Sequence, residues 1–507
     1  MKFGVTAGVA GLWLAGFAGQ VVAQDVTLTS RDKSIEISGN LLGFDGDYYR
    51  VETVYGELTV DSTGVLCEGP ACPNLESYVA HLTFSGSRQI GRVLLPALIE
   101  GYARQANLIA VREEKGADSL RYWIQSADGA ETAGLFDIRL TSSSEGFADV
   151  LSNEADIAMS LREATGDEIA LTEEIGLGRL TKNRQQIFLG FDSVSVIVPD
   201  ASPLDQIGLD EVAGLISGGI TSWAGLGVDE DAPVQVVGFE GLPEVWGQVQ
   251  QEIAGLGYAL DGEIGELPLG GDAENLLSVP FGFHSQVPER MRALAFRANC
   301  GMVYEPDELA LRSGELPFRF PLILYRPMRR LPEIGQEFLD FVKSPSGQRV
   351  VARAGYVPAT PRLYDFEAIG YRIVNGILLS ETPEDFTALK ETIAALKAGQ
   401  LVGGGLRVGE NGRLTAGSLS LIAHVVQMVE LGQIDGKQIL FAGFGPDSDL
   451  ARQAMEMFTD ALSDGSYNFS TEARHFGELL PLACPDTDAG IALNARIEIW
   501  LRQPDPR

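Results

Sequence analysis

Short runs of alternating hydrophobic and polar residues mark the first part of the chain. They span residues 34–38, 48–54 and 57–60, and the turn pairs Asp45-Gly46 and Tyr55-Gly56 separate them. Alternation with period two indicates strands, and such turn pairs between two strands indicate hairpins. Residues 24–76 are therefore predicted to form a small β module.

A second pattern, in which strand-like apolar runs alternate with helix-length segments, covers residues 78–365. Strands are predicted at residues 80–84, 138–141 and 156–159, and a helix is predicted at 90–105, where apolar residues recur at helical spacing. Strands that alternate with helices build α/β sheets. This part of the chain is therefore predicted to be an α/β domain.

The last part of the chain combines both patterns. Residues 366–384 are weakly patterned and are predicted to be a linker, and residues 385–507 are predicted to form an α+β domain. The elements expected in this domain are helices at residues 384–396 and 418–431 and strands at 438–442 and 495–500.

The first 23 residues have the pattern of a secretion signal. Lys2 is the only charged residue before Asp25, residues 9–18 are apolar, and Val21-Val22-Ala23 supplies a small-residue cleavage pattern. The alternative is a membrane anchor, but the apolar run is shorter than the roughly 20 residues that a spanning helix needs. We therefore expect cleavage near Ala23 and a mature protein in the periplasm.

The composition argues against two classes of partner. The chain has 70 acidic and 38 basic side chains and a formal net charge of −32. Such a charge disfavours binding to nucleic acid and to anionic lipid. A small anion is not excluded, because buried anion sites are often built from backbone N–H groups at helix N-termini.

The four cysteines suggest disulfides, since disulfides persist in exported proteins. Cys67 and Cys72 flank a turn that contains Gly69 and Pro70, and they are predicted to form a bridge, with two free thiols as the alternative. Cys300 and Cys484 either pair across domains or stay free. The four histidines do not lie at ligand spacing from a second His or Cys, so no metal site and no cofactor are predicted.

Two serine turns are the candidate binding elements. Each follows a predicted strand and opens a predicted helix: Ser85-Gly86-Ser87 in one case and Ser142-Ser143-Ser144 in the other. Hydroxyls and free N–H groups at helix starts can hold an oxyanion, although serine also caps helices routinely. Arg88 is either an anion contact or a surface residue. No nucleophile elbow, phosphate loop or zinc-protease motif occurs, so an enzyme is not predicted.

Nine short motifs in a characteristic order lie between residues 81 and 361. They are residues 84–91, 142–147, 156–162, 193–198, 216–223, 322–325, 338–341, 346–348 and 355–358. This segment resembles the periplasmic phosphate-binding proteins of ABC transporters, which have a two-lobed solute-binding fold. The resemblance implies a small anion such as phosphate as the ligand and an inner-membrane ABC permease as the partner.

The resemblance also implies which residues contact the ligand. In the first lobe they are Ser85, Gly86, Ser87, Arg88, Gln89, Ser142, Ser143, Ser144 and Ser160, and in the second lobe, at about 195–285, they are Glu240 and Gly241. The family usually has an Arg and a Ser-Gly-Thr turn in the second lobe, where this chain has the carboxylate of Glu240. A carboxylate repels phosphate.

Residues 385–507 resemble the OmpA-like peptidoglycan-binding domain. The closing motif is carried by residues 476–481 and 486–499. The resemblance implies contact with peptidoglycan through Asp447, Arg452, Asn494 and Arg496. The family's Asp and Arg are replaced here by Pro446 and Ala454, with Asp447 and Arg452 nearby.

The sequence therefore predicts a two-lobed α/β solute-binding fold, preceded by a small β module and followed by an α+β OmpA-like domain. Two functions are compatible with it. One is a periplasmic solute-binding protein that captures a small oxyanion and contacts the cell wall. The other is an envelope scaffold or interaction protein with degenerate ligand sites.

Overall fold

The structure, a computed structural model, describes residues 25–503 except 47, 75–78, 183, 230–231, 239–241, 261–277, 410–412 and 463–466. The predicted secretion signal at residues 1–23 lies outside these described residues. The chain divides into two compact units, Met1–Val79 and Ala80–Arg507. In the described parts, no helix has the length and apolar character needed to cross a bilayer.

The first unit contains one antiparallel sheet with the strand order β4-β3-β2-β1-β5. Its small core consists of Val26, Leu28, Tyr49 and Val51, which alternate with more exposed residues along their strands. Cys67 and Cys72 form a disulfide, so the predicted pairing is confirmed. The strands are β1 (Val26–Ser30), β2 (Glu36–Phe44), β3 (Tyr48–Thr53), β4 (Gly56–Asp61) and β5 (Val65–Glu68).

The first lobe of the second unit is built on three neighbouring parallel strands. They are β6 (Ala80–Ser87), β9 (Thr132–Thr141) and β10 (Ile157–Ser160), with β6 in the middle. The hairpin of β7 (Leu108–Gly116) and β8 (Ser119–Ser126) extends this sheet beside β9. The lobe's helices are η2 (Ile90–Leu94) with its continuation α1 (Leu95–Gln105), α2 (Ser143–Leu151), α3 (Gly166–Glu174), α7 (Glu333–Lys343) and α8 (Pro345–Arg353).

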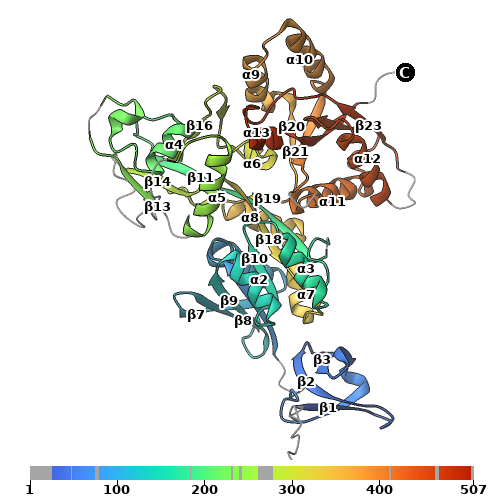
Figure 1. Cartoon of the computed structure of the whole chain (residues 1–507). Coiled ribbons are helices and arrows are strands. Elements are labelled where there is room, and N and C mark those ends of the chain that lie inside the picture. The colour runs from blue at the N-terminus through green and yellow to red at the C-terminus, as the bar shows by residue number, and fades with distance from the viewer. Residues whose placement is uncertain are drawn as a thin grey trace, which may run out of the picture. The chain divides into compact units, whose positions relative to one another are not determined.

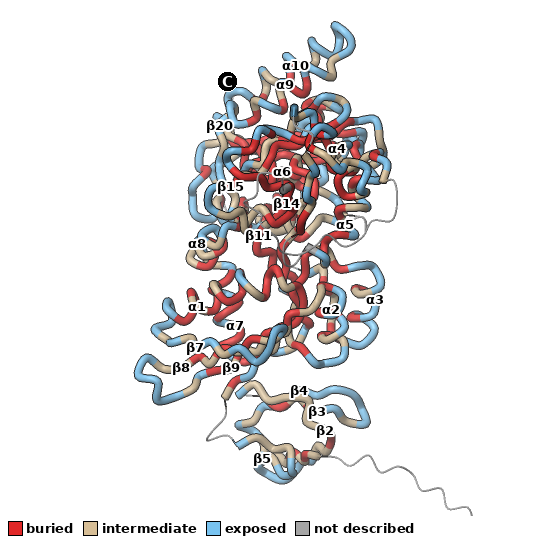
Figure 2. The backbone as a smooth tube through the Cα atoms, turned by 90° about the vertical axis from the view of Figure 1, so that its left-hand side faces the viewer, coloured by how far each residue is buried: buried red, intermediate tan, exposed pale blue. Residues whose placement is uncertain are grey.

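Two long strands carry the chain between the lobes (Figure 1). β11 (Gln186–Pro199) pairs with β18 (Arg319–Tyr325) and, nearer its end, with β14 (Ser278–Phe283) and β15 (Met291–Ala293). The second lobe consists of the elements between β11 and β18. Figure 2 shows that β11, β14 and α6 (Glu308–Ser313) are largely buried. The remaining elements of this lobe are β12 (Gln206–Gly208), α4 (Leu209–Ile216), β13 (Gln235–Gly238), α5 (Leu242–Gly255), β16 (Ala295–Arg297) and β17 (Val303–Tyr304).

The C-terminal domain has a five-stranded sheet in the order β20-β21-β24-β22-β23. The strands are β20 (Leu363–Asp365), β21 (Gly399–Leu406), β22 (Gln438–Phe444), β23 (Ser470–His475) and β24 (Arg496–Arg502). The helices are α9 (Gly370–Leu378), α10 (Pro383–Leu396), α11 (Ala416–Glu430), α12 (Leu450–Ala461) and α13 (Asp488–Asn494). The stretch that we expected to be a linker thus contains α9.

A buried charge cluster lies in the core of this domain. Glu498 is 1% exposed and accepts hydrogen bonds from Arg372 Nη1 at 3.0 Å, Arg496 Nε at 2.7 Å and Trp500 Nε1 at 3.0 Å. Burial acts to raise the pKa of Glu498, but the charges of Arg496 and Arg372 outweigh it and lower that pKa. Arg372 Nε also donates to Glu315 of the second lobe at 2.6 Å.

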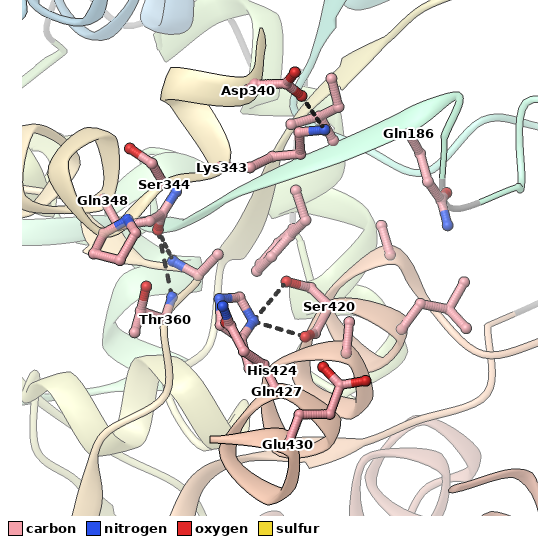
Figure 3. A pocket seen from close by; sticks show the side chains of 17 residues that line it. Gln186, Asp340, Lys343, Ser344, Gln348, Thr360, Ser420, His424, Gln427 and Glu430 are labelled. Carbon is pink, nitrogen blue, oxygen red and sulfur yellow. Dashed lines mark hydrogen bonds and ion pairs between the residues drawn. The ribbon is translucent and has the colours of Figure 1, made fainter. Parts of the chain in front are cut away.

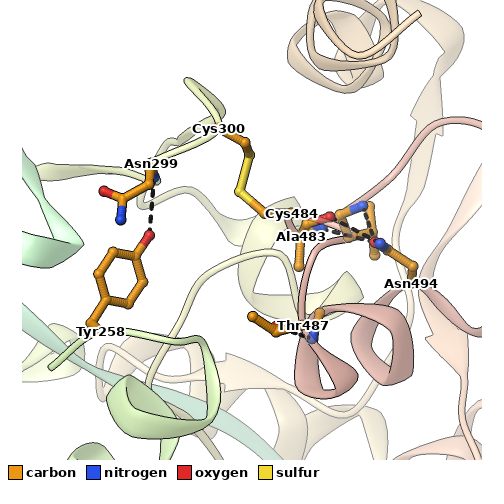
Figure 4. The surroundings of a disulfide bond; sticks show 9 residues. Tyr258, Asn299, Cys300, Ala483, Cys484, Thr487 and Asn494 are labelled. Carbon is orange, nitrogen blue, oxygen red and sulfur yellow. Dashed lines mark hydrogen bonds between the residues drawn. A yellow bond between two sulfur atoms is a disulfide. The ribbon is translucent and has the colours of Figure 1, made fainter. Parts of the chain in front are cut away.

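The C-terminal domain is fastened to both lobes. A disulfide joins Cys300 of the second lobe to Cys484, which resolves the pairing that the sequence left open (Figure 4). On the first lobe, Glu163 Oε1 accepts a hydrogen bond from Ala416 N at 2.9 Å, at the start of α11. Motion of one lobe against the other is therefore opposed by a domain that holds both.

Candidate anion site between the lobes

The two serine turns meet at one edge of the first-lobe sheet. Because β6, β9 and β10 are parallel, their carboxyl ends lie together, and Ser87, Thr141 and Ser160 are the last residues of these strands. Helix N-termini at this edge are the usual place for an anion in open α/β sheets. Gly86 allows the strands to approach, since a Cβ there would lie 2.1 Å from Met159 O and φ is +134°.

A carboxylate of the protein itself occupies this edge. Glu244, in the first turn of α5 in the second lobe, places Oε1 2.8 Å from Ser143 N and 2.7 Å from Ser143 Oγ, and both groups donate to it. The Ser143 hydroxyl in turn accepts from Leu161 N at 3.0 Å. The site that the sequence predicted for an external oxyanion therefore contains an internal one.

Burial is the largest influence on the ionisation of Glu244. Burial raises the pKa of this carboxyl, and the Ser143 and Ser87 hydroxyls, the Ser143 N–H and the Arg162 charge only partly oppose the rise. Oε2 is buried, and no hydrogen bond from the described residues reaches it. Ser87 and Ser143, which we call the serine cradle, thus hold the carboxylate through one oxygen, while the other oxygen is desolvated.

The remaining predicted first-lobe serines have other partners. Ser142 caps α2 in a capping box with Glu145. Ser85 Oγ donates to Asp149 Oδ2 at 2.6 Å. Ser144 Oγ accepts from Arg162 Nη2 at 3.0 Å, and Ser160 Oγ donates to Arg162 O at 2.7 Å. Of the predicted serines, Ser87 and Ser143 are the ones beside the Glu244 carboxylate.

The Arg88 side chain pairs with a carboxylate in the turn between β7 and β8. Its guanidinium forms an ion pair with Asp118 Oδ1 at 2.6 Å, and the side chains of Arg88 and Asp118 are 33% and 59% exposed to solvent. The alternative interpretation of Arg88, a surface residue, therefore describes its position in this structure.

Gln89 links the first lobe to the crossing strands. Its amide Nε2 donates to Asp192 Oδ2 at 2.9 Å and to Ser285 Oγ at 3.2 Å, and its Oε1 accepts from Gln286 Nε2 at 3.0 Å. Asp192 is 2% exposed, and burial raises its pKa to about 6 despite its hydrogen bonds from Ser285 and Gln89. Gln89 thus serves a buried network between the lobes.

The second-lobe candidates Glu240 and Gly241 lie outside the described residues, and their roles stay predictions. The second-lobe group that does reach the serines is Glu244. The sequence analysis missed it because 101 residues separate it from Ser143, and nothing in the local pattern of α5 distinguishes it from an ordinary acidic residue in a first helical turn.

A second carboxylate on α5, Glu252, is expected to make stability depend on pH. Burial raises the pKa of Glu252 to about 7, against partial opposition from the Phe318 N–H and the Arg319 charge. The folded state then binds a proton at Glu252 more tightly than the unfolded chain does. The stabilisation from this proton is fully present below pH 4.5 and is lost as pH rises through 7.

The variant Glu252→Gln keeps an acceptor for Phe318 N and removes the titration. We compare the free energy of unfolding of this variant with that of the original chain. The difference should change by about 2–3 kcal/mol in favour of the variant as pH rises from 5 to 8. Urea unfolding at both pH values measures this difference. An equal difference at both values would contradict the assignment of the raised pKa to Glu252.

The predicted peptidoglycan residues fall into two pairs. Asn494 and Arg496 are 6% and 1% exposed, and they bond internally, to Ala483 and Leu480 carbonyls among others. Asp447 and Arg452 are exposed, and Arg452 pairs with Asp449 and Glu456. Peptidoglycan contact by these residues stays a prediction.

A cavity of about 570 Å³ lies between the first lobe and α11 (Figure 3). Several of its polar groups bond to the protein: Lys343 Nζ pairs with Asp340 at 2.9 Å, and His424 Nδ1 lies 2.7 Å from Ser420 O. Burial lowers the pKa of His424, and the hydrogen bond with the Ser420 backbone opposes this shift in part. Among the described residues, no group of three potential metal ligands occurs.

A sequence model described as a PBP superfamily domain matches residues 80–238. This match covers β6 to β13, the part of the chain that contains the serine turns. Residues 80–238 are therefore similar to a domain of the PBP superfamily. The matched segment contains Ser87 and Ser143, whereas Glu244 lies beyond it.

Solved structures with similar chains include three phosphate-binding proteins. A putative phosphate ABC transporter substrate-binding protein with bound phosphate, from Clostridium perfringens, is 18% identical, with 55% of this chain and 99% of that chain covered and a TM-score of 0.39. An ABC-type phosphate transport receptor from Vibrio cholerae is 18% identical, with 54% and 99% covered and a TM-score of 0.38. A possible phosphate binding protein from Planctomyces limnophilus is 15% identical, with 56% and 94% covered and a TM-score of 0.39. The search of curated proteins found no match.

Proposed function

We propose that the protein is a non-enzymatic scaffold of the periplasm, in which the serines of the first lobe hold the Glu244 carboxylate of the second lobe in place of a captured solute. The observation that supports this proposal best is the pair of hydrogen bonds from Ser143 to Glu244 Oε1. An external oxyanion would have to displace a carboxylate that is tethered to the second lobe and therefore present at high effective concentration.

The attachment of the C-terminal domain supports the same function. Solute-binding proteins act by hinge closure of their lobes. Here the Cys300–Cys484 disulfide and the Glu163–Ala416 hydrogen bond tie one domain to both lobes. A fixed arrangement suits a scaffold, and the OmpA-like features of residues 385–507 suit an anchor on peptidoglycan.

Capture of a small oxyanion such as phosphate, with delivery to an inner-membrane ABC permease, is the second candidate. The donor groups at the start of α2 favour it, because Ser143 offers both an N–H and an O–H to an anion. In that case Glu244 would swing out when the lobes open.

Calorimetry with sodium phosphate and sodium sulfate distinguishes the two functions. For the scaffold, the double variant Ser87→Ala/Ser143→Ala should give the same titration as the original chain, because the serine cradle takes no external anion. Ser152→Ala, an exposed serine at the other end of α2, is the control. Binding heat that disappears in the double variant and persists in Ser152→Ala would overturn the scaffold and support oxyanion capture.

A further inference from the structure

A smaller cavity, of about 160 Å³, lies where the crossing strands meet the C-terminal domain. Its lining includes three arginines: Arg312 at the end of α6, Arg319 at the start of β18, and Arg407, which follows β21. The glycines at 403–405 and the start of α11 complete the wall. A helix N-terminus adds positive potential to that of the guanidinium groups.

Two of these arginines have no carboxylate partner. Among the described residues, no ion pair within 4.0 Å involves Arg319 or Arg407, whereas Arg312 pairs with Glu308 at 2.8 Å. Arg319 donates to the carbonyls of Leu311 and Arg312, and Arg407 donates to those of Leu493 and Ser313. Neutral carbonyls satisfy N–H groups but do not neutralise the two charges.

The side chains of Arg319 and Arg407 both line the cavity and are only partly exposed to solvent. Arg407 Nε is buried and has no hydrogen-bond partner in the part of the chain that the structure describes. Burial, together with the neighbouring charges of Arg319 and Arg496, lowers the pKa of Arg407 to about 9. Burial also lowers the pKa of Arg319 to about 10. Desolvated charges are costly for a fold unless a counter-charge accompanies them.

The acidic groups nearby are already engaged or more distant. Glu163 is the carboxylate that lines the cavity, and its two oxygens accept from Ala416 N at 2.9 Å and from the Tyr325 hydroxyl at 3.3 Å. Glu252 and Glu498 act on Arg319 and Arg407 from beyond ion-pair distance. The cavity therefore keeps a positive surplus.

We infer that this cavity binds one small oxyanion of the phosphate or sulfate class, held by Arg319 and Arg407. Guanidinium groups match the oxygens of such anions in charge and in fork geometry. The volume is well above the about 10–15 Å³ that one water needs. The bound anion joins the crossing strands to the C-terminal domain, so it stabilises the scaffold and is distinct from the serine cradle.

The test uses the full mature chain, dialysed into chloride buffer and titrated with sodium phosphate or sodium sulfate at constant ionic strength. Calorimetry should detect one site, and the melting temperature should rise with anion concentration, because a ligand of the folded state stabilises it by mass action. Arg407→Gln and Arg319→Gln should each weaken binding about 10- to 100-fold, the loss expected for a charged hydrogen bond.

Two controls locate the site. Arg112→Gln removes an arginine that is 40% exposed and paired with Glu114 on β7, and it should leave binding unchanged, as should Ser143→Ala. Binding that survives in Arg407→Gln, or that is lost in Ser143→Ala, would overturn the inference, and the second result would overturn the scaffold as well.

The original chain alone also decides the question if the glutamine variants fail to fold. If neither anion produces heat or raises the melting temperature, the inferred anion site at Arg319 and Arg407 is overturned, and the proposed scaffold function is unaffected. Arg319→Lys keeps the charge without the fork, and about tenfold weaker binding is expected from it.

Discussion

Glu498→Ala is expected to lower the free energy of unfolding of the C-terminal domain by about 3–5 kcal/mol. The substitution leaves Arg372 and Arg496 buried, at 2% and 1% exposure, without the carboxylate between them, and breaking a buried charge pair in this way is among the costliest single changes. Trp500 also loses its acceptor.

Urea unfolding followed by tryptophan fluorescence and by protease sensitivity measures this loss. The control is Glu456→Ala in the same domain, because Glu456 pairs with Arg452 on the surface, at exposures of 55% and 53%. Surface pairs contribute about 0.3–0.5 kcal/mol. Similar losses in the two variants would contradict the structural role of Glu498.

Replacing Cys300 and Cys484 together by Ala should destabilise the Ala80–Arg507 unit by about 2–5 kcal/mol. The bond joins residues 184 apart, and a long closed loop restricts the unfolded chain strongly. The measurement is thermal unfolding of the oxidised proteins. We also expect easier separation of the C-terminal domain from the second lobe, visible as new protease cleavage between them.

The double variant Cys67→Ala/Cys72→Ala is the matched control. Its disulfide closes a separation of only 5 residues and belongs to the other compact unit. It should leave the main transition of residues 80–507 unchanged. A main transition that shifts equally in both double variants would show that the Cys300–Cys484 bond contributes no specific connection.

Much of the local structure was predictable from the sequence, because it depends on local patterns. The expected strand at residues 80–84 corresponds to β6, the one at 156–159 to β10, and the helix expected at 418–431 to α11. The expected turn at residues 85–87 is instead the end of strand β6, and no side chain caps the η2 helix that follows it, whereas the Ser142 hydroxyl caps α2. Each feature that was predicted correctly is encoded within a few residues.

The decisive contacts of the site were not predictable, because they join distant segments. Glu244 resembles any acidic residue at a helix start until the fold brings it to Ser143. Arg319 and Arg407 resemble surface arginines until the C-terminal domain covers them. Helix α9 was missed because the residues on its buried face, Arg372, Asn375 and Gly376, are not apolar, whereas its apolar residues, including Val374 and Leu378, are exposed.

The strand β20 determines how the protein can be dissected. Leu363–Asp365 forms the edge of the C-terminal sheet by pairing with β21, and Arg372 enters that domain's core from the segment between. A fragment that starts at residue 385 would therefore lack an edge strand and a cation beside Glu498. Any wall-binding assay on a shortened protein therefore needs a fragment that starts before Leu363. Even that fragment would carry an unpaired Cys484, and the surface around Arg372 that contacts Glu315 in the full chain would be exposed.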